Sequence, residues 1–168
     1  YMVDTAPSSA SLDRGDLPTV LAGVVGVNVV GAVPALLAGP DSAWFRSLVK
    51  PDIYPPPWAF GVVWTALFTL LGVAVALVWL SGPGRRPVRV ALGVFAAQMA
   101  LNVAWTPAFF ALEDLALGLA VIVALWPLVA ATLWAFARVD RRAAALVVPY
   151  LLWVTFAAVL NYRFLVLN

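Results

Sequence analysis

The 168-residue sequence contains no histidine and no cysteine. Without an imidazole or a thiol, we exclude Ser-His-Asp and Cys-His catalysis, the usual zinc sites, iron–sulfur clusters, haem with His or thiolate ligands, and disulfides. Lysine occurs once, at Lys50 beside a proline, so a Schiff-base lysine within a membrane span is also absent. We therefore expect no metal site and no cofactor that the protein requires.

Charge is scarce as well. Charged residues make up 11% of the sequence, hydrophobic residues make up 64%, and the mean hydropathy is +0.99. A soluble domain is about 45–50% apolar and about 25% charged, and disorder needs low hydrophobicity. The composition thus excludes both classes and indicates an integral membrane protein that contacts the lipid bilayer. A net charge of only +2 gives no indication of nucleic-acid binding.

Five segments are long and apolar enough to cross a bilayer, which takes about 20 residues. They are apolar on all sides, whereas barrel strands alternate apolar and polar residues. We predict an all-α integral membrane protein built as a bundle of five transmembrane helices. The predicted spans cover residues 17–38, 58–80, 88–111, 115–137 and 143–166. Several should be kinked by internal prolines, at Pro34, Pro107, Pro127 and Pro149.

The predicted domain organisation is a polar N-terminal tail over residues 1–16, followed by a single membrane domain over 17–168. The first connection, residues 39–57, is the longest, and it contains Trp44 and Phe45 before a proline-rich exit. A long aromatic loop over a compact bundle is typical of a lid over a site. The alternative is a simple linker.

Cations are distributed unequally between the two predicted faces of the membrane. By the positive-inside rule, the face with more Lys and Arg is cytoplasmic. We therefore expect a prokaryotic cell-membrane protein with a cytoplasmic N-terminus and with the long first loop and the C-terminus outside. The cation-rich face carries Arg14, Arg85, Arg86, Arg89, Arg138, Arg141 and Arg142, whereas the other carries Arg46, Lys50 and Arg163.

Polar and aromatic residues recur along one face of three predicted spans, although no ionised residue lies deep in any span. Inward amides and indoles would line an aromatic cavity suited to a small molecule. The alternative is that these rings only fill the core or form interfacial belts. The three stripes are Phe60, Trp64 and Phe68; Gln98, Asn102, Trp105 and Phe109; and Tyr150, Trp153, Ala157, Asn161 and Phe164.

Small residues spaced four apart also occur within the spans. Such pairs let helices approach closely, within one chain or between two. They suggest a homodimer. The pairs are Ala22/Gly26, Gly72/Ala76 and Gly93/Ala97.

Four stretches between Trp44 and Asn161 together resemble the TspO/MBR family, the tryptophan-rich sensory proteins related to the mitochondrial translocator protein. They match the family in order and in spacing. The stretches are WFRSLVKP from Trp44, PPPWAF from Pro55 leading to Trp64 and Phe68, QMALNVAW from Gln98 with Phe109 and Phe110, and PYLLW from Pro149 with Leu160 and Asn161.

The resemblance implies a five-helix bundle, commonly dimeric, that binds tetrapyrroles such as protoporphyrin IX, together with sterols and synthetic isoquinoline carboxamides or benzodiazepines. The implied role is that of a sensor or regulator of tetrapyrrole or stress responses. Alternatives are light- and oxygen-dependent porphyrin breakdown, with Trp64 and Trp153 as the catalytic residues, and transport of porphyrin or lipid. The implied ligand-binding residues are Phe45, Pro55, Phe60, Trp64, Phe68, Asn102, Trp105, Trp153, Ala157 and Leu160.

Two departures from the family pattern bear on the ligand. The family's sterol motif requires a spacer between a tyrosine and a basic residue, but here Arg163 directly follows Tyr162, so the sequence does not support sterol binding. Phe45 and Phe68 each replace a frequent tyrosine. Since haem would lack its usual axial ligands, we expect metal-free porphyrin to bind at least as well as haem.

Overall fold

The computed structural model describes residues 12–168, and the regular secondary structure of this part is helical throughout. Short helix α2 lies in the connection between α1 and α3, and a π-helical turn, η1, continues α4. The all-α, five-span prediction is confirmed, with span ends displaced by at most two residues. The elements are α1 (Leu17–Leu37), α2 (Ala43–Ser47), α3 (Pro57–Leu80), α4 (Arg86–Thr106), η1 (Pro107–Ala111), α5 (Leu115–Ala137) and α6 (Arg141–Leu167).

The predicted N-terminal tail lies mostly outside the described residues. Residues 12–16 form a turn that leads into α1, in which the N–H of Asp16 donates to the carbonyl oxygen of Asp13 at 3.2 Å. The division between tail and membrane domain stays a prediction.

Local sequence explains where the helices begin and turn. The Asp114 and Asp140 carboxylates accept backbone N–H groups at the starts of α5 and α6, which satisfies donors that have no partner within the helix. The reversals before α4 and α5 contain Gly82 (φ 109°) and Glu113 (φ 54°), both in the left-handed region. Prolines, which suit a first helical turn because they lack an N–H, occur there in α1, α3 and α4.

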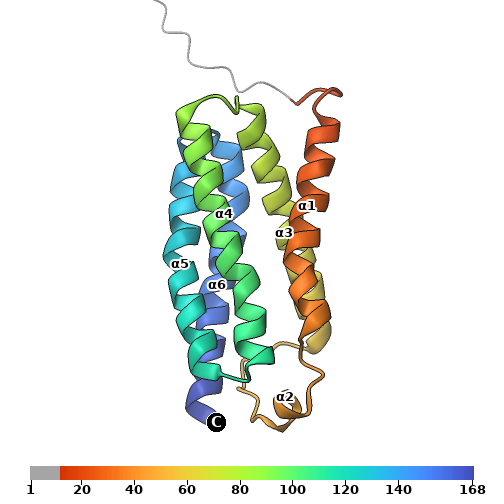
Figure 1. The fold of residues 1–168 in the computed structure, drawn as a ribbon, viewed down its shortest axis with the longest axis vertical. Helices are drawn as coiled ribbons and strands as arrows, with labels where there is room; N and C mark the ends of the chain where they lie inside the picture. Colours follow the sequence, from red (N-terminus) through yellow and green to blue (C-terminus); the bar gives the residue numbers. More distant parts are fainter. Residues whose placement is uncertain (1–11) are drawn as a thin grey trace, which may run out of the picture.

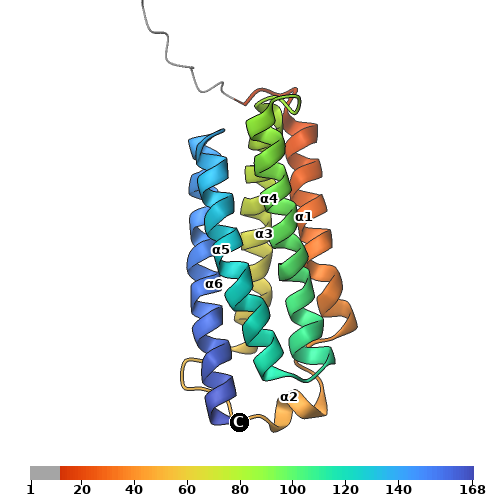
Figure 2. The same ribbon diagram turned by 60° about the vertical axis from the view of Figure 1, so that its left-hand side comes forward.

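The five long helices form a ring. Helix α1 packs along α3, α3 along α6, α6 along α5, and α5 along α4, whereas α4 touches α1 and α3 at fewer positions. One end of the ring, here called the loop end, carries α2, the α4–α5 turn and the end of α6 (Figures 1 and 2). The opposite end, the turn end, carries the α3–α4 and α5–α6 turns.

Helices α1 and α3 cross with their backbones in contact. A Cβ atom on Gly72 would overlap the backbone of Val24, and one on Gly23 would overlap the carbonyl oxygen of Gly72. The Gly72/Ala76 pair therefore permits close approach as predicted. By contrast, a Cβ on Gly26 or Gly93 would meet nothing within 4 Å, so these two glycines make no close helix contact within one chain. Their role between chains stays a prediction.

The internal prolines fall in two classes. Pro34, Pro127 and Pro149 lie inside α1, α5 and α6, as predicted. Pro107 does not interrupt an α-helix, because it begins the π-helical turn η1, which closes with a bond from the N–H of Leu112 to the carbonyl oxygen of Pro107 at 2.9 Å. This local change of helix type accommodates the missing N–H of the proline.

Candidate ligand-binding cavity

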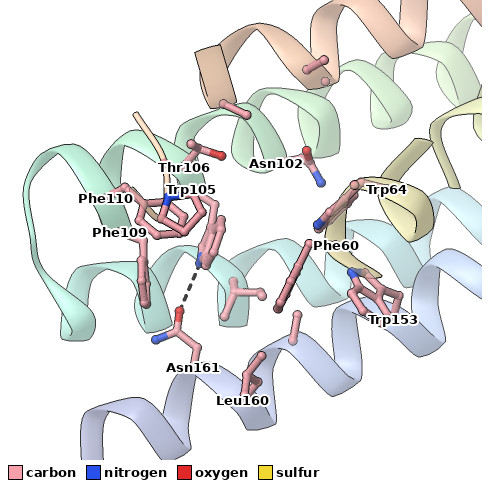
Figure 3. Close-up of a pocket in the computed structure, with 18 of the residues that line it drawn as sticks. Phe60, Trp64, Asn102, Trp105, Thr106, Phe109, Phe110, Trp153, Leu160 and Asn161 are labelled. Atoms are coloured by element: carbon pink, nitrogen blue, oxygen red, sulfur yellow. Dashed lines mark hydrogen bonds between the residues drawn. The ribbon is translucent and has the colours of Figure 1, made fainter. Parts of the chain in front are cut away.

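A cavity of about 410 Å³ occupies the loop end of the ring (Figure 3). Helices α1, α3, α4, α5 and α6 and the α1–α3 loop all contribute to its wall. Its size falls in the range of about 300–1,000 Å³ that is usual for small-molecule sites. The aromatic lining residues are Phe45, Tyr54, Phe60, Trp64, Phe68, Trp105, Phe109, Phe110, Trp153 and Phe164.

Indole and phenyl rings form two fixed surfaces around this space. On one side, Trp64 of α3 and Trp153 of α6 lie edge-to-face, with ring centroids 6.3 Å apart and an interplanar angle of 88°. On the other side, Trp105 of α4 stacks on Phe109 of η1 at 5.0 Å and 27°. Such pairs contribute about 0.5–1.5 kcal/mol each beyond the area they bury. The cavity therefore has rigid aromatic surfaces before any ligand enters.

Two of the three indoles that line the cavity, those of Trp105 and Trp153, differ in their hydrogen bonding. Trp105 Nε1 donates to Asn161 Oδ1 at 3.1 Å, and Asn161 Nδ2 donates to the carbonyl oxygen of Leu115 at 3.1 Å. This chain joins α4, α6 and the start of α5. In contrast, Trp153 Nε1 is buried without a hydrogen-bond partner, so it is a donor that a ligand could satisfy.

A buried polar chain closes the cavity on the side of the turn end. Asn102 Nδ2 donates to the Tyr150 hydroxyl at 2.8 Å, and that hydroxyl donates to Gln98 Oε1 at 2.9 Å. Of these three residues, only Asn102 lines the cavity. The predicted stripes on α4 and α6 thus continue past the cavity into the packed core.

The loop between α1 and α3 covers the loop end. Phe45, only 4% exposed, packs against Phe110 and Phe164, with centroids 5.2 and 5.7 Å away. Lys50 Nζ donates to the carbonyl oxygens of Phe45 and Leu48, and it lies 4.3 Å from the Phe45 ring centroid. Burial lowers the pKa of Lys50. The loop is therefore an ordered cover, while its opening and closing stay a prediction.

A second contact ties the cover to α6. The Asn168 side chain accepts the N–H of Val49 at 2.7 Å and donates to the carbonyl oxygen of Val49 at 3.1 Å. Tyr54 contacts Phe60 of α3, with centroids 5.5 Å apart, and burial raises the pKa of Tyr54. The loop is thus fixed to the two helices that supply Trp64 and Trp153.

Residues 20–167 match the model of the TspO/MBR family. The chain belongs to the TspO/MBR family. It is 44% identical over 129 residues to "Tryptophan-rich protein TspO" of Chlorobaculum tepidum, covering 77% of this chain and 82% of that protein. It is 43% identical over 138 residues to "Tryptophan-rich sensory protein" of Cereibacter sphaeroides, covering 82% and 84%. Identity to the human "Translocator protein" is 38% over 126 residues, covering 74% of each chain. The protein is therefore an integral membrane protein.

The structure brings nearly all the residues implied by the TspO/MBR resemblance to one cavity. Pro55 is the exception, since its neighbours Tyr54 and Pro57 line the cavity instead. The residues that do line it are Phe45, Phe60, Trp64, Phe68, Asn102, Trp105, Trp153, Ala157 and Leu160.

Sequence reasoning missed the contribution of α1 to this TspO/MBR cavity. Gly31, Ala32, Ala35 and Ala38 line it. A Cβ atom on Gly31 would overlap the Phe68 ring, so this glycine lets the ring pack against α1, whereas the small alanine side chains leave room where bulkier residues would fill the space. The spacing of these residues on one helical face is the signal that was available. Asn28, on the same face, donates to Thr69 Oγ1 of α3 at 3.2 Å.

Proposed function

We propose that this protein binds a tetrapyrrole such as protoporphyrin IX in the cavity and acts as a membrane sensor or regulator of tetrapyrrole or stress responses. The observation that carries the proposal is the aromatic cavity at the loop end, where the indoles of Trp64, Trp105 and Trp153 surround a space of about 410 Å³. Stacking and hydrophobic enclosure favour a flat apolar ligand. A relative named as a tryptophan-rich sensory protein supports the regulatory role.

Recognition should not require a metal in the porphyrin. With no histidine or cysteine in the sequence, haem finds none of its usual axial ligands. We therefore expect protoporphyrin IX to bind at least as tightly as haem. Titration of the purified protein with both ligands, followed by quenching of tryptophan fluorescence, measures this. Haem binding far tighter than protoporphyrin IX would contradict it.

The site is tested by a matched pair of tryptophan variants. Trp153→Ala removes a lining residue, whereas Trp79→Ala removes an indole that is 49% exposed on the outside of α3. We expect Trp153→Ala to weaken protoporphyrin IX binding about tenfold or more, equivalent to at least about 1.4 kcal/mol. Trp79→Ala should change it less than about twofold. Equal affinities of the two variants would place the ligand elsewhere.

A second candidate function is light-driven oxidation of the porphyrin by molecular oxygen. Trp64 and Trp153 favour it, since their indoles adjoin one another at 6.3 Å in the cavity wall, close enough for both to contact one ligand. Illumination of the protein with protoporphyrin IX in air should yield a new absorbing product. If the Trp64→Phe/Trp153→Phe double variant forms the product equally fast, these residues have no catalytic role.

We also propose that the turn end faces the cytoplasm of a prokaryotic cell and that two copies form a dimer. The turn end carries Arg85, Arg86, Arg138 and Arg141, and the loop end carries Arg46 and Lys50. Because the chain has no cysteine, single cysteines at Gly84 and Ser47 can report the exposed side in intact cells with an impermeant thiol reagent. Labelling of Gly84→Cys but not of Ser47→Cys would contradict the proposed orientation.

Transport of porphyrin or lipid is a further candidate function. It would be supported only if the protein, placed in liposomes, carried the ligand across their membrane.

A further inference from the structure

The side-chain amide of Asn161 can satisfy its two partners in one orientation only. Its Oδ1 accepts a hydrogen bond from Trp105 Nε1 at 3.1 Å, and its Nδ2 donates to the carbonyl oxygen of Leu115 at 3.1 Å. An indole N–H can only donate and a backbone carbonyl can only accept, so turning the amide round would break both bonds. Asn161 is 2% exposed, and a lost hydrogen bond is costly in such a buried place. The amide therefore fixes the direction of the Trp105 N–H.

The two faces of the Trp105 ring have different surroundings. Phe109 stacks on the ring with centroids 5.0 Å apart and an interplanar angle of 27°, and Phe110 meets it edge-to-face at 5.8 Å. Figure 3 shows Phe109 on one side of the ring and Phe60 on the other side, across the cavity. One face of Trp105 is thus covered by Phe109, while the other is turned to the open space that a ligand would occupy.

Gly118 of α5 lies behind this group of side chains. It is buried and does not line the cavity. A Cβ atom at this position would lie 2.8 Å from Cδ2 of the Phe109 ring and 3.2 Å from Asn161 Oδ1, whereas carbon atoms pack at about 3.5–4.0 Å. Any larger residue would therefore push the ring and the amide away from α5. The glycine provides the room in which Phe109 and Asn161 take up their positions.

We propose that Asn161 and Gly118 are positioning residues that hold the Trp105 indole stacked on Phe109, so that its opposite face binds one ring system of a flat aromatic ligand. The proposal rests on the proposed function above and assigns one wall of the cavity to face-to-face contact with that ligand. A ring that is already held in one orientation loses little freedom when a ligand stacks on it, which favours binding.

A double-variant comparison tests whether Asn161 acts through Trp105. The probes are protoporphyrin IX and pyrenecarboxylate, a flat aromatic that is not a tetrapyrrole, and their dissociation constants are measured by quenching of tryptophan fluorescence in the purified protein. Asn161→Leu removes the acceptor of the Trp105 N–H, and one net hydrogen bond corresponds to a loss of about three- to tenfold in affinity. In Trp105→Phe, which has no N–H, adding Asn161→Leu should change the affinity for either probe by less than about 1.5-fold.

Matched controls separate positioning from general structural damage. Trp126 Nε1 donates to Thr155 Oγ1 of α6 at 2.8 Å, and neither residue lines the cavity. Thr155→Val thus removes an indole acceptor of the same kind from the same helix as Asn161, and it should leave both affinities unchanged. Gly118→Ala should weaken both probes at least about threefold, whereas Gly93→Ala, whose new Cβ meets nothing within 4 Å, should not. If Asn161→Leu does not fold, this glycine pair decides the test.

Equal losses from Asn161→Leu with and without the Trp105 N–H would overturn the proposal, because Asn161 would then not act through Trp105. Unchanged affinities in Gly118→Ala would overturn it as well. If pyrenecarboxylate binds and depends on Asn161 while protoporphyrin IX does not bind, only the tetrapyrrole proposal is rejected. If protoporphyrin IX binds equally well to all the variants, only this inference is rejected. Binding of neither probe rejects both.

Discussion

The two ends of the helix ring are built from similar residues but are filled differently. At the turn end, Leu71, Val78, Val88 and Val147 are fully buried, and Phe95 stacks on Phe136 with centroids 5.9 Å apart. At the loop end, larger rings such as Trp64 and Trp105 surround a cavity and stay partly exposed within it. The residues around the cavity at the loop end are thus as hydrophobic as those that fill the packed turn end.

Side-chain size on α1 accounts for much of this difference. At the crossing near the turn end, Gly23 and Gly72 bring α1 and α3 into backbone contact. Along the loop end, Ala32 and Ala35 line the cavity, and no bulky side chain from α1 fills it. Gly31 leaves space that the Phe68 ring occupies. Small residues therefore have opposite effects in the two halves. Near the turn end they let two helices pack in contact, and at the loop end they leave space for the cavity.

The largest effect is expected at the crossing. Gly72→Val places side-chain atoms where the backbone of Val24 lies, so α1 must move away from α3. Because such a substitution overpacks a close helix contact, we expect the free energy of unfolding to fall by more than about 4 kcal/mol. Thermal unfolding in detergent measures it. The matched control is Gly93→Val, in a helix position with no atom within 4 Å of a new Cβ. If both variants lose the same stability, helix propensity rather than the crossing is responsible.

Removing one large ring from each half should separate stability from binding. Phe136→Ala leaves a void in the packed turn end and should cost about 3–5 kcal/mol of unfolding free energy, with porphyrin affinity nearly unchanged. Trp64→Ala enlarges an existing cavity, so it should cost less stability but weaken porphyrin binding about tenfold or more. Unfolding and titration are measured on both variants. Similar losses in both measurements would mean that the two halves do not act independently.

The sequence was sufficient for the helices and for most of the cavity wall, because lipid exposure makes the spans apolar throughout and the aromatic stripes repeat at helical spacing. The stripe of Phe60, Trp64 and Phe68 faces the cavity as predicted. Periodicity could not show that Gln98, on the stripe of Asn102, and Tyr150, on the stripe of Trp153, lie beyond the cavity. The point along a helix at which a stripe no longer lines the cavity depends on how far apart the helices lie. The small residues of α1, in another part of the chain, determine that separation.

An intermediate effect is expected from the cover of the loop end. Asn168→Ala removes both hydrogen bonds to Val49, and net hydrogen-bond contributions of about 0.5–1.5 kcal/mol predict release of bound porphyrin roughly three- to tenfold faster. Stopped-flow dilution of the complex measures the rate. Arg163→Ala, which alters an exposed residue near the same end of α6, is the control. An unchanged release rate in Asn168→Ala would mean that the ligand does not leave past this cover.

The smallest effect is expected at the turn end, far from the cavity. A side-chain hydrogen bond from Arg142 holds the pKa of Asp140 below its usual value. A depressed folded-state pKa contributes stability that is present above the unfolded pKa of about 3.9 and is lost as the pH falls through the folded value. Asp140→Asn keeps a capping oxygen but loses the charge, so it should be less stable than the unmodified protein by under about 1 kcal/mol at pH 7. Unfolding temperatures should converge as the pH falls below about 4, with porphyrin affinity at pH 7 unchanged. A difference that grows in acid would mean that the charge of Asp140 does not stabilise the turn end.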